Sequence, residues 1–164
     1  MSTVKTANIQ HFGAANAAIT LASDGSVGVQ AQTGMRNRFI NGAMMIDQRN
    51  AGASVTPTTN FTYTLDRWVA GLIQSSKFSV QQSSTAPAGF SNSILITSLS
   101  AYTVTSTDYF NINQFIEGFN TADLAWGTAN AQTVTLSFKV YSSLTGTFGG
   151  AIINSAFNYS YPFS

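Results

Sequence analysis

Short runs of alternating apolar and polar residues, separated by turn-forming residues, recur from Met35 to the end of the chain. The clearest run spans residues 134–140, VTLSFKV, in which every second side chain is apolar. Because successive side chains of a strand point to opposite faces of a sheet, this period of two predicts a strand. No long stretch has the 3.6-residue period of a helix. We therefore predict an all-β fold, an antiparallel β-sandwich of the jelly-roll kind.

The other elements are predicted by the same reasoning. Further strands are expected over residues 38–48, 61–73, 77–82, 92–98, 108–116 and 144–153. Glycines within the last of these predict bends or a bulge. The residues between the strands are rich in Gly, Pro, Ser, Thr and Asn, and residues 50–60 and 83–89 are predicted loops. Residues 120–127 predict about one helical turn that stops at Gly127.

The chain is nearly uncharged, and this composition limits its function. Only 8% of its 164 residues are charged and the formal net charge is +1, so a nucleic-acid partner is not expected. With 44% hydrophobic residues, one domain can bury enough surface to fold. No apolar run of about 18 residues is present, so no membrane insertion is expected. A weakly charged surface tolerates contact with its own copies, and assembly with sister chains is predicted.

Residues 1–34 differ from the rest because they hold few large side chains and cannot build a core alone. Alternating residues 19–22 and 26–30 flank an Asp-Gly dipeptide, a strong signal for a short hairpin. Two interpretations remain open, a flexible leader or an arm that becomes ordered against a partner or against sister chains. We assign residues 1–34 to an N-terminal arm for docking or oligomerisation and residues 35–164 to the β-sandwich.

No residue pattern identifies a catalytic or metal site. Asp108 with Glu117 or Asp123 would supply the paired carboxylates of a glycosidase, but solvation and turn formation explain scattered carboxylates equally well. The chain has no Cys, one histidine (His11), no Gly-x-Ser-x-Gly motif and no phosphate-binding loop. Calcium could bind at Asp108, or at Asp123 with Asn120, but these residues do not have the spacing of an EF-hand loop. We predict that the protein is not an enzyme and uses no cofactor or metal.

Exposed aromatic side chains could instead form a sugar-binding surface. The C–H faces of a pyranose stack on flat rings, while its hydroxyl groups need polar partners. Trp126 lies in a loop-like stretch with Asp123 and Asn130 nearby, and Tyr109 is a further aromatic candidate. In a small sandwich such rings can equally be core residues, and Trp68 is expected to be one. We retain Tyr109, Asp123, Trp126 and Asn130 as candidate glycan contacts.

Charge is concentrated in one stretch, because six of the thirteen charged residues lie between positions 36 and 67. Arg49 offers a fork-shaped donor and Asp66 a carboxylate, which together can form a bidentate pair. Arg67 lies next to Trp68 and can stack on a ring. We predict a structural clamp of Arg49, Asp66, Arg67 and Trp68 that holds two strands in register. The alternative is an anionic-ligand site built from the arginines of this stretch, Arg36, Arg38, Arg49 and Arg67.

The same stretch resembles a known signature. Residues 38–49, RFINGAMMIDQR, followed by residues 63–68, YTLDRW, resemble a pattern in tail fibres and other tail-associated proteins of tailed bacteriophages, notably phages of marine bacteria and cyanobacteria. Residues 114–119, 133–140 and 144–148 resemble the same module, which is similar to a carbohydrate-binding-module-like jelly roll. We call residues 38–49 and 63–68 together the charged motif.

The leader also resembles the N-terminal segment of such fibres, in residues 6–11 and 18–25. The resemblance therefore covers nearly the whole chain and implies a virion-anchoring end. The residues that it assigns to docking on other phage tail proteins are Lys5, Asn8, Ile9 and His11.

The resemblance implies a structural virion protein, a tail fibre or its tail-proximal part, that forms a homotrimer and takes part in host adsorption. It would be made in the host cytoplasm without a signal peptide and reside in the virion tail. The alternative is a lectin-like receptor-binding module that recognises a host cell-surface glycan. Family members usually continue past the equivalent of residues 161–164, so we expect this end to be incomplete or covered by a neighbouring chain.

Overall fold

The computed structural model describes residues 8–9, 19–21, 23, 27–29 and 37–164. These residues form strands, turns and two short 3₁₀ helices, and no α-helix occurs among them. Every strand pair within the described ranges is antiparallel. The prediction of an all-β protein is confirmed, in the form of several small antiparallel sheets. The chain divides into two compact units, Met1–Ala131 and Gln132–Ser164.

The N-terminal part of the first unit contains a three-stranded sheet in the order β1-β2-β3. Its strands are β1 (Asn8–Ile9), β2 (Ile19–Leu21) and β3 (Val27–Val29). Pairing of β2 with β3 confirms the two strands predicted for the hairpin. The predicted arm boundary at residues 34 and 35 lies outside the described residues and stays a prediction.

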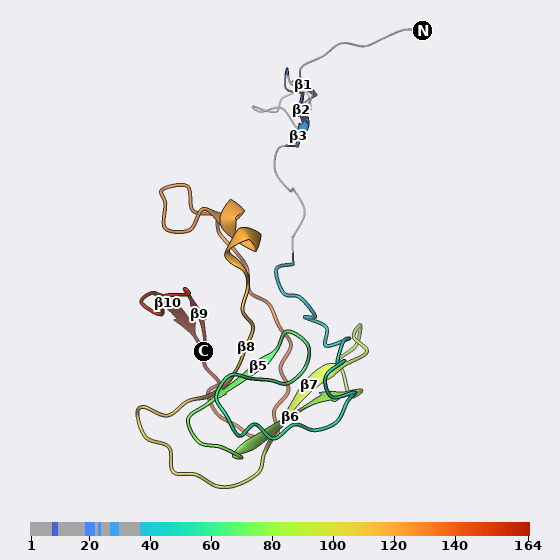
Figure 1. The fold of residues 1–164 in the computed structure, drawn as a ribbon, viewed down its shortest axis with the longest axis vertical. Helices are drawn as coiled ribbons and strands as arrows, with labels where there is room; N and C mark the ends of the chain where they lie inside the picture. Colours follow the sequence, from blue (N-terminus) through green and yellow to red (C-terminus); the bar gives the residue numbers. More distant parts are fainter. Residues whose placement is uncertain (1–7, 10–18, 22, 24–26, 30–36) are drawn as a thin grey trace. The chain divides into compact units, whose positions relative to one another are not determined.

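Two further sheets of the first unit follow in the chain (Figure 1). One contains β4 (Thr62–Tyr63), β5 (Val69–Leu72) and β8 (Phe110–Asn113) in the order β4-β5-β8. The other pairs β6 (Phe78–Ser83) with β7 (Ser93–Ser98). Both strands of the β6–β7 hairpin form where the alternating pattern predicts them, whereas β8 is shorter than predicted.

One hydrophobic cluster contains residues of both of these sheets. Ala70 and Leu72 come from β5, Phe78 and Val80 from β6, and Leu65 from the turn before β5. All five side chains are buried. Because burial of apolar surface contributes roughly 25 cal/mol per Å², this cluster is the main source of stability in the sheets around it. Partly buried side chains complete it, namely Met44, Trp68, Ile94, Phe110 and Ile112.

The strand predicted over residues 38–48 is wrong, because this segment is a succession of turns and irregular backbone. Asn41 and Met44 have positive φ angles of 57° and 55°, which a strand does not allow. The cause is local, since the dipeptide Asn41-Gly42 favours a turn and Asn tolerates the left-handed region well. An apolar alternation across this dipeptide therefore does not make a strand.

The strand predicted over residues 61–73 is divided into β4 and β5 by a tight turn. The N–H of Trp68 donates to the carbonyl of Leu65 at 3.0 Å, and Arg67 has a φ of 73°. All four residues of β5 are buried, as expected for a strand paired on both sides with β4 and β8. The turn therefore places Leu65 and Trp68 against the hydrophobic cluster.

Residues 118–124 form two 3₁₀ helices, η1 (Gly118–Asn120) and η2 (Ala122–Leu124). The helical turn predicted over residues 120–127 is confirmed in kind, although it begins earlier. Leu124 is buried and anchors this segment. Gly127, with a φ of 86°, follows the helices as predicted, because its backbone leaves the helical region.

The second unit contains one hairpin, β9 (Gly150–Ile153) with β10 (Ser160–Phe163). A side chain on Gly150 would overlap the Phe163 ring, so a glycine permits this close approach. Residues 134–140, the clearest strand prediction, pair with no strand among the described residues, and the prediction of a paired strand is wrong here. Alternation supplies two faces, but a strand also needs a neighbouring edge for its N–H and C=O groups.

We predict that Gly71→Ala destabilises the first unit. A Cβ atom on Gly71 would overlap Oδ1 of Asn111 on β8 and lie 3.0 Å from Nδ2 of Asn113. Overpacking of this kind typically costs about 1–3 kcal/mol of unfolding free energy, measurable by urea denaturation. Gly118→Ala is the matched control, because a Cβ there meets open space. Gly71→Ala/Asn111→Ala should recover stability, and equal destabilisation with and without the second change would contradict the explanation.

Candidate functional site

Asn41 joins the two parts of the charged motif. Its Nδ2 donates to the carbonyls of Ile46 (2.8 Å) and Asp66 (2.9 Å), and its Oδ1 accepts the N–H of Ile46 (2.9 Å). Its own carbonyl accepts the indole N–H of Trp68 at 3.0 Å. These bonds hold one turn of the motif against the turn that precedes β5. Our sequence reasoning missed Asn41, although the Asn-Gly dipeptide was a readable signal for a special turn.

Other amide side chains attach the motif to the strands around it. Gln114 pairs with the backbone of Ile40 in both directions, with Nε2 donating to its carbonyl and Oε1 accepting its N–H, each at 2.9 Å. Nδ2 of Asn50 donates to the carbonyl of Thr64 at 2.6 Å. A neutral amide can donate and accept at once, so it satisfies irregular backbone in the way that a strand partner would.

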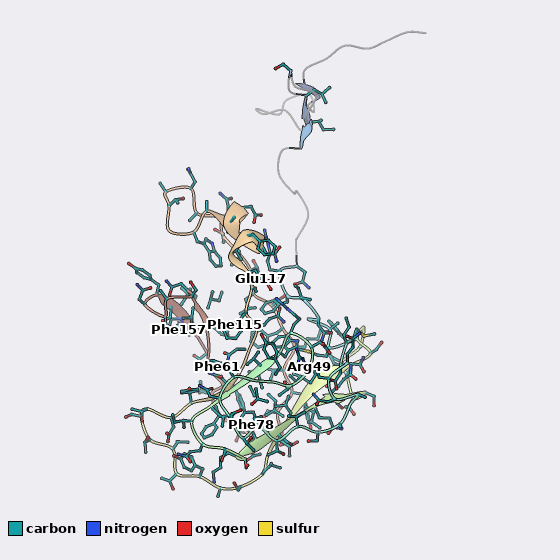
Figure 2. All side chains as sticks on the ribbon, in the orientation of Figure 1. Arg49, Phe61, Phe78, Phe115, Glu117 and Phe157 are labelled. Carbon is teal, nitrogen blue, oxygen red and sulfur yellow. The ribbon has the colours of Figure 1, made fainter. Side chains whose placement is uncertain are left out.

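The predicted Arg49–Asp66 ion pair does not form, because neither of the two ion pairs among the described residues joins these side chains. Asp66 Oδ2 instead accepts the N–H of Gln48 at 2.6 Å. The guanidinium of Arg49, which is labelled in Figure 2, lies over the Tyr63 ring, 5.0 Å from its centroid. Asp66 therefore bonds to the backbone next to Arg49 and not to the Arg49 guanidinium.

Arg67 also differs from its predicted role. It donates from Nη2 to Glu117 Oε1 at 2.6 Å and to the carbonyl of Phe115 at 3.1 Å. This bond from Arg67 holds the pKa of the Glu117 carboxyl below its usual range. Trp68 instead stacks on Phe39, with ring centroids 5.9 Å apart and planes within 5°. The charged motif is therefore tied to the segment after β8 as well as to β4 and β5.

Arg38 forms the second ion pair, with both oxygens of Asp123. Nη1 lies 2.8 Å from Oδ1 and Nη2 lies 2.6 Å from Oδ2, a bidentate geometry that fixes direction as well as charge. Nη1 also donates to the carbonyl of Asn120. The hydrogen bonds to Asp123 raise the pKa of Arg38. This pair attaches both 3₁₀ helices to the start of the charged motif.

The alternative of an anionic-ligand site gains no support from the three described arginines of the motif. Arg38 and Arg67 each face a carboxylate, and Arg49 lies over an aromatic ring. Arg36 lies outside the described residues. The described charges of the motif therefore serve internal contacts, which agrees with the broad idea of a structural clamp while its predicted partners were wrong.

The candidate glycan contacts fall into two places. Asp123, Trp126 and Asn130 belong to the segment that includes η2 and the turns after it, and Trp126 is 47% exposed. Tyr109 precedes β8 and its hydroxyl accepts a hydrogen bond from Nδ2 of Asn60 at 2.6 Å. Asp123 is engaged with Arg38, so the exposed indole is the main feature that this segment offers to a sugar.

The predicted docking and chemical residues are only partly described. Asn8 and Ile9 form β1, whereas Lys5 and His11 lie outside the described residues. Asp108 Oδ2 accepts the N–H of Thr105 at 2.7 Å, and this hydrogen bond lowers the pKa of Asp108. Across the described ranges, no group of three His, Cys, Asp or Glu side chains is arranged to hold a metal ion.

No protein-family model, curated protein or solved structure matches the chain. Among the residues described, none of the helices has the length and apolar character needed to cross a bilayer.

We predict that Arg49 and Asp66 act independently on stability. Asp66→Ala removes a charged acceptor from the Gln48 N–H and should lower the unfolding free energy by about 1–2 kcal/mol. Arg49→Ala removes an exposed cation–π contact and should cost about 0.5–1 kcal/mol. A double-mutant cycle in urea should give a coupling energy within about 0.5 kcal/mol of zero. A larger coupling energy would indicate that Arg49 and Asp66 form an ion pair after all. Asp66→Asn, which keeps a hydrogen-bond acceptor, serves as the control.

We predict that the Arg67–Glu117 pair makes stability depend on pH on the acid side. Folding lowers the pKa of Glu117 from an unfolded value of 4.5, so the stabilisation is present above that pH. It is lost as the pH falls through the lower folded pKa. The difference in Tm between wild type and Glu117→Gln, measured by circular dichroism, should therefore be largest near neutral pH and shrink towards about pH 3. Arg67→Gln should flatten the profile similarly, and a difference that stays constant with pH would contradict the pair.

Proposed function

We propose that the protein is a structural component of a bacteriophage virion, a tail fibre or its tail-proximal part. It attaches to the phage tail and takes part in adsorption to the host. The likeness of residues 38–49 and 63–68 to the tail-fibre signature motivates this proposal. The observation that carries it is that the described charges of this signature are engaged in internal contacts. A motif used in this way suits a structural protein better than an enzyme.

A jelly-roll sandwich is the finer architecture that we propose for the domain. The β4-β5-β8 and β6-β7 sheets contribute side chains to one hydrophobic cluster, as the two layers of a sandwich do. Antiparallel pairing throughout the described strands is consistent with this arrangement. The likeness to a carbohydrate-binding-module-like jelly roll supports the same proposal.

Association of sister chains as a homotrimer is the second part of the proposal. Leu95 and Ile96 are neighbours on β7, so they point to opposite faces, and both are about half exposed. β7 pairs with β6 alone among the described strands and carries neither charge nor proline on its edge. Such edges readily pair with another chain. The second unit has no buried residue, so its large apolar side chains are also available to a neighbour.

The N-terminal arm would dock on other tail proteins and leave the domain to project from the tail. Asn8 and Ile9 lie in a small sheet whose short strands can carry this contact. Lys5 and His11 belong to the same proposed docking arm. In this view the chain resides in the virion tail after its synthesis in the host cytoplasm.

A lectin-like receptor-binding module is the second candidate. The exposed indole of Trp126 favours it, because a flat ring that is 47% exposed can stack on a pyranose. A glycan array tests this candidate, because it requires a glycan that binds through the Trp126 indole. Binding that is abolished by Trp126→Ala would establish the lectin function.

We predict that antibodies against the protein label the tail of the phage that encodes it, in electron micrographs of purified particles. Cross-linking of the particles should yield trimers of the chain. In the isolated protein, Leu95→Lys should weaken the trimer, measured by light scattering, because it places a charge on the β7 edge. Ser84→Lys adds the same charge at an exposed loop position and should leave assembly unchanged. Labelling confined to the capsid, or cross-linked particles that contain only monomers, would contradict the proposal.

A further inference from the structure

A pocket of about 500 Å³ opens beside the β6–β7 and β5–β8 pairs, away from the charged motif. Its lining includes β6, β7 and β8 and the loop over residues 99–109. Pockets of about 300–1,000 Å³ are the usual size for small-molecule sites in proteins. The volume therefore suits one or two linked rings.

Three aromatic rings form one wall of this pocket. Phe110 makes edge contacts with Phe78, at 6.2 Å between centroids and 90° between planes, and with Tyr102, at 5.8 Å and 76°. Phe78 is buried and belongs to the hydrophobic cluster, so the wall is anchored in the core. Tyr102 is half-buried and comes from the loop that contributes to the pocket lining. A rigid apolar wall with an accessible ring is suited to the C–H face of a sugar.

Among the described residues, Lys77 is the one charged residue that lines the pocket. Its Nζ lies 5.3 Å from the centroid of the Tyr102 ring and donates to Oγ of Ser100 at 3.3 Å. An ammonium group has three N–H donors, so these contacts leave donor capacity for a ligand. The cation and the ring are therefore held at the same place.

No carboxylate among the described residues forms an ion pair with Lys77. Asp108 accepts the N–H of Thr105 at 2.7 Å and the hydroxyl of Tyr102, and it forms no ion pair with Lys77 among the described residues. The hydroxyls of Ser98 and Ser100 supply neutral polar groups at the pocket lining. The pocket thus combines a ring, one cation and hydrogen-bonding groups.

We propose that this pocket binds an acidic pyranose, a sugar ring that carries a carboxylate, of the kind found in bacterial surface polysaccharides. The ring packs its C–H face against Tyr102, the carboxylate meets Lys77, and the hydroxyls of the sugar reach those of Ser98 and Ser100. The inference rests on the proposed role in host adsorption, for which it names the class of ligand. It assigns binding to residues other than the candidate glycan contacts at Trp126 and Tyr109.

The test is titration of the full chain with methyl glucuronide, followed by two-dimensional NMR of the amide signals. Shifts should appear for residues of β6, β7 and the loop over residues 99–109, and methyl glucoside should bind at least tenfold more weakly. Lys77→Met should weaken glucuronide binding at least tenfold, because the cation is lost. Lys139→Met, which removes a lysine in the second unit, is the matched control and should leave binding unchanged.

Two further measurements distinguish binding of the sugar from binding of other carboxylic acids. Tyr102→Phe should retain binding, whereas Tyr102→Ala should abolish it, because the ring and not the hydroxyl stacks on the sugar. Cyclohexanecarboxylate that binds as tightly as the glucuronide would overturn the sugar assignment. Shifts confined to other residues, or none at 50-fold excess over protein, would overturn the site itself. Trimer formation and tail labelling do not depend on Lys77, so they test the proposed function separately.

Discussion

The side-chain amide of Asn41 is the contact on which the arrangement of the charged motif depends. It bridges two turns that are far apart in sequence, through the carbonyls of Ile46 and Asp66, while its own carbonyl receives the indole N–H of Trp68. Trp68 packs against the core cluster, and Leu65 of the same turn is buried within it. Irregular backbone is therefore held at the core by hydrogen bonds of a neutral side chain.

This use of amides explains how a chain with so little charge maintains irregular segments. Gln114 mimics a strand partner for Ile40, and Gln82 donates from Nε2 to the carbonyl of Met44 at 2.5 Å. Asn60 Oδ1 accepts the N–H of Leu72 at 3.0 Å. The described ion pairs act at the edges of this network and connect the motif to the segment after β8. The weakly charged surface that results is compatible with close contact between copies.

Much of the fold was predictable where local pattern and pairing agree. β6 and β7 were predicted because their alternation is flanked by a short turn-forming segment that brings one strand back along the other. The strand over residues 38–48 failed because the Asn41-Gly42 turn overrides an apolar alternation. For the candidate site, the importance of Asp66, Arg67 and Trp68 was predictable from the concentration of charge and aromatic character. The partners of Arg49 and Asp66 were not.

The sequence alone determined the all-β class, through its period of two and its lack of a helical period. It also determined the tight turns, because Asn, Asp and Gly act on the backbone within a few residues. Only the tertiary structure decided which charges meet, since Arg38 with Asp123 and Arg67 with Glu117 are contacts between distant segments. It also placed Lys77 beside Tyr102 at the pocket. The physical reason is that long-range contacts depend on how strands pair and pack, whereas turns and alternation depend on neighbouring residues.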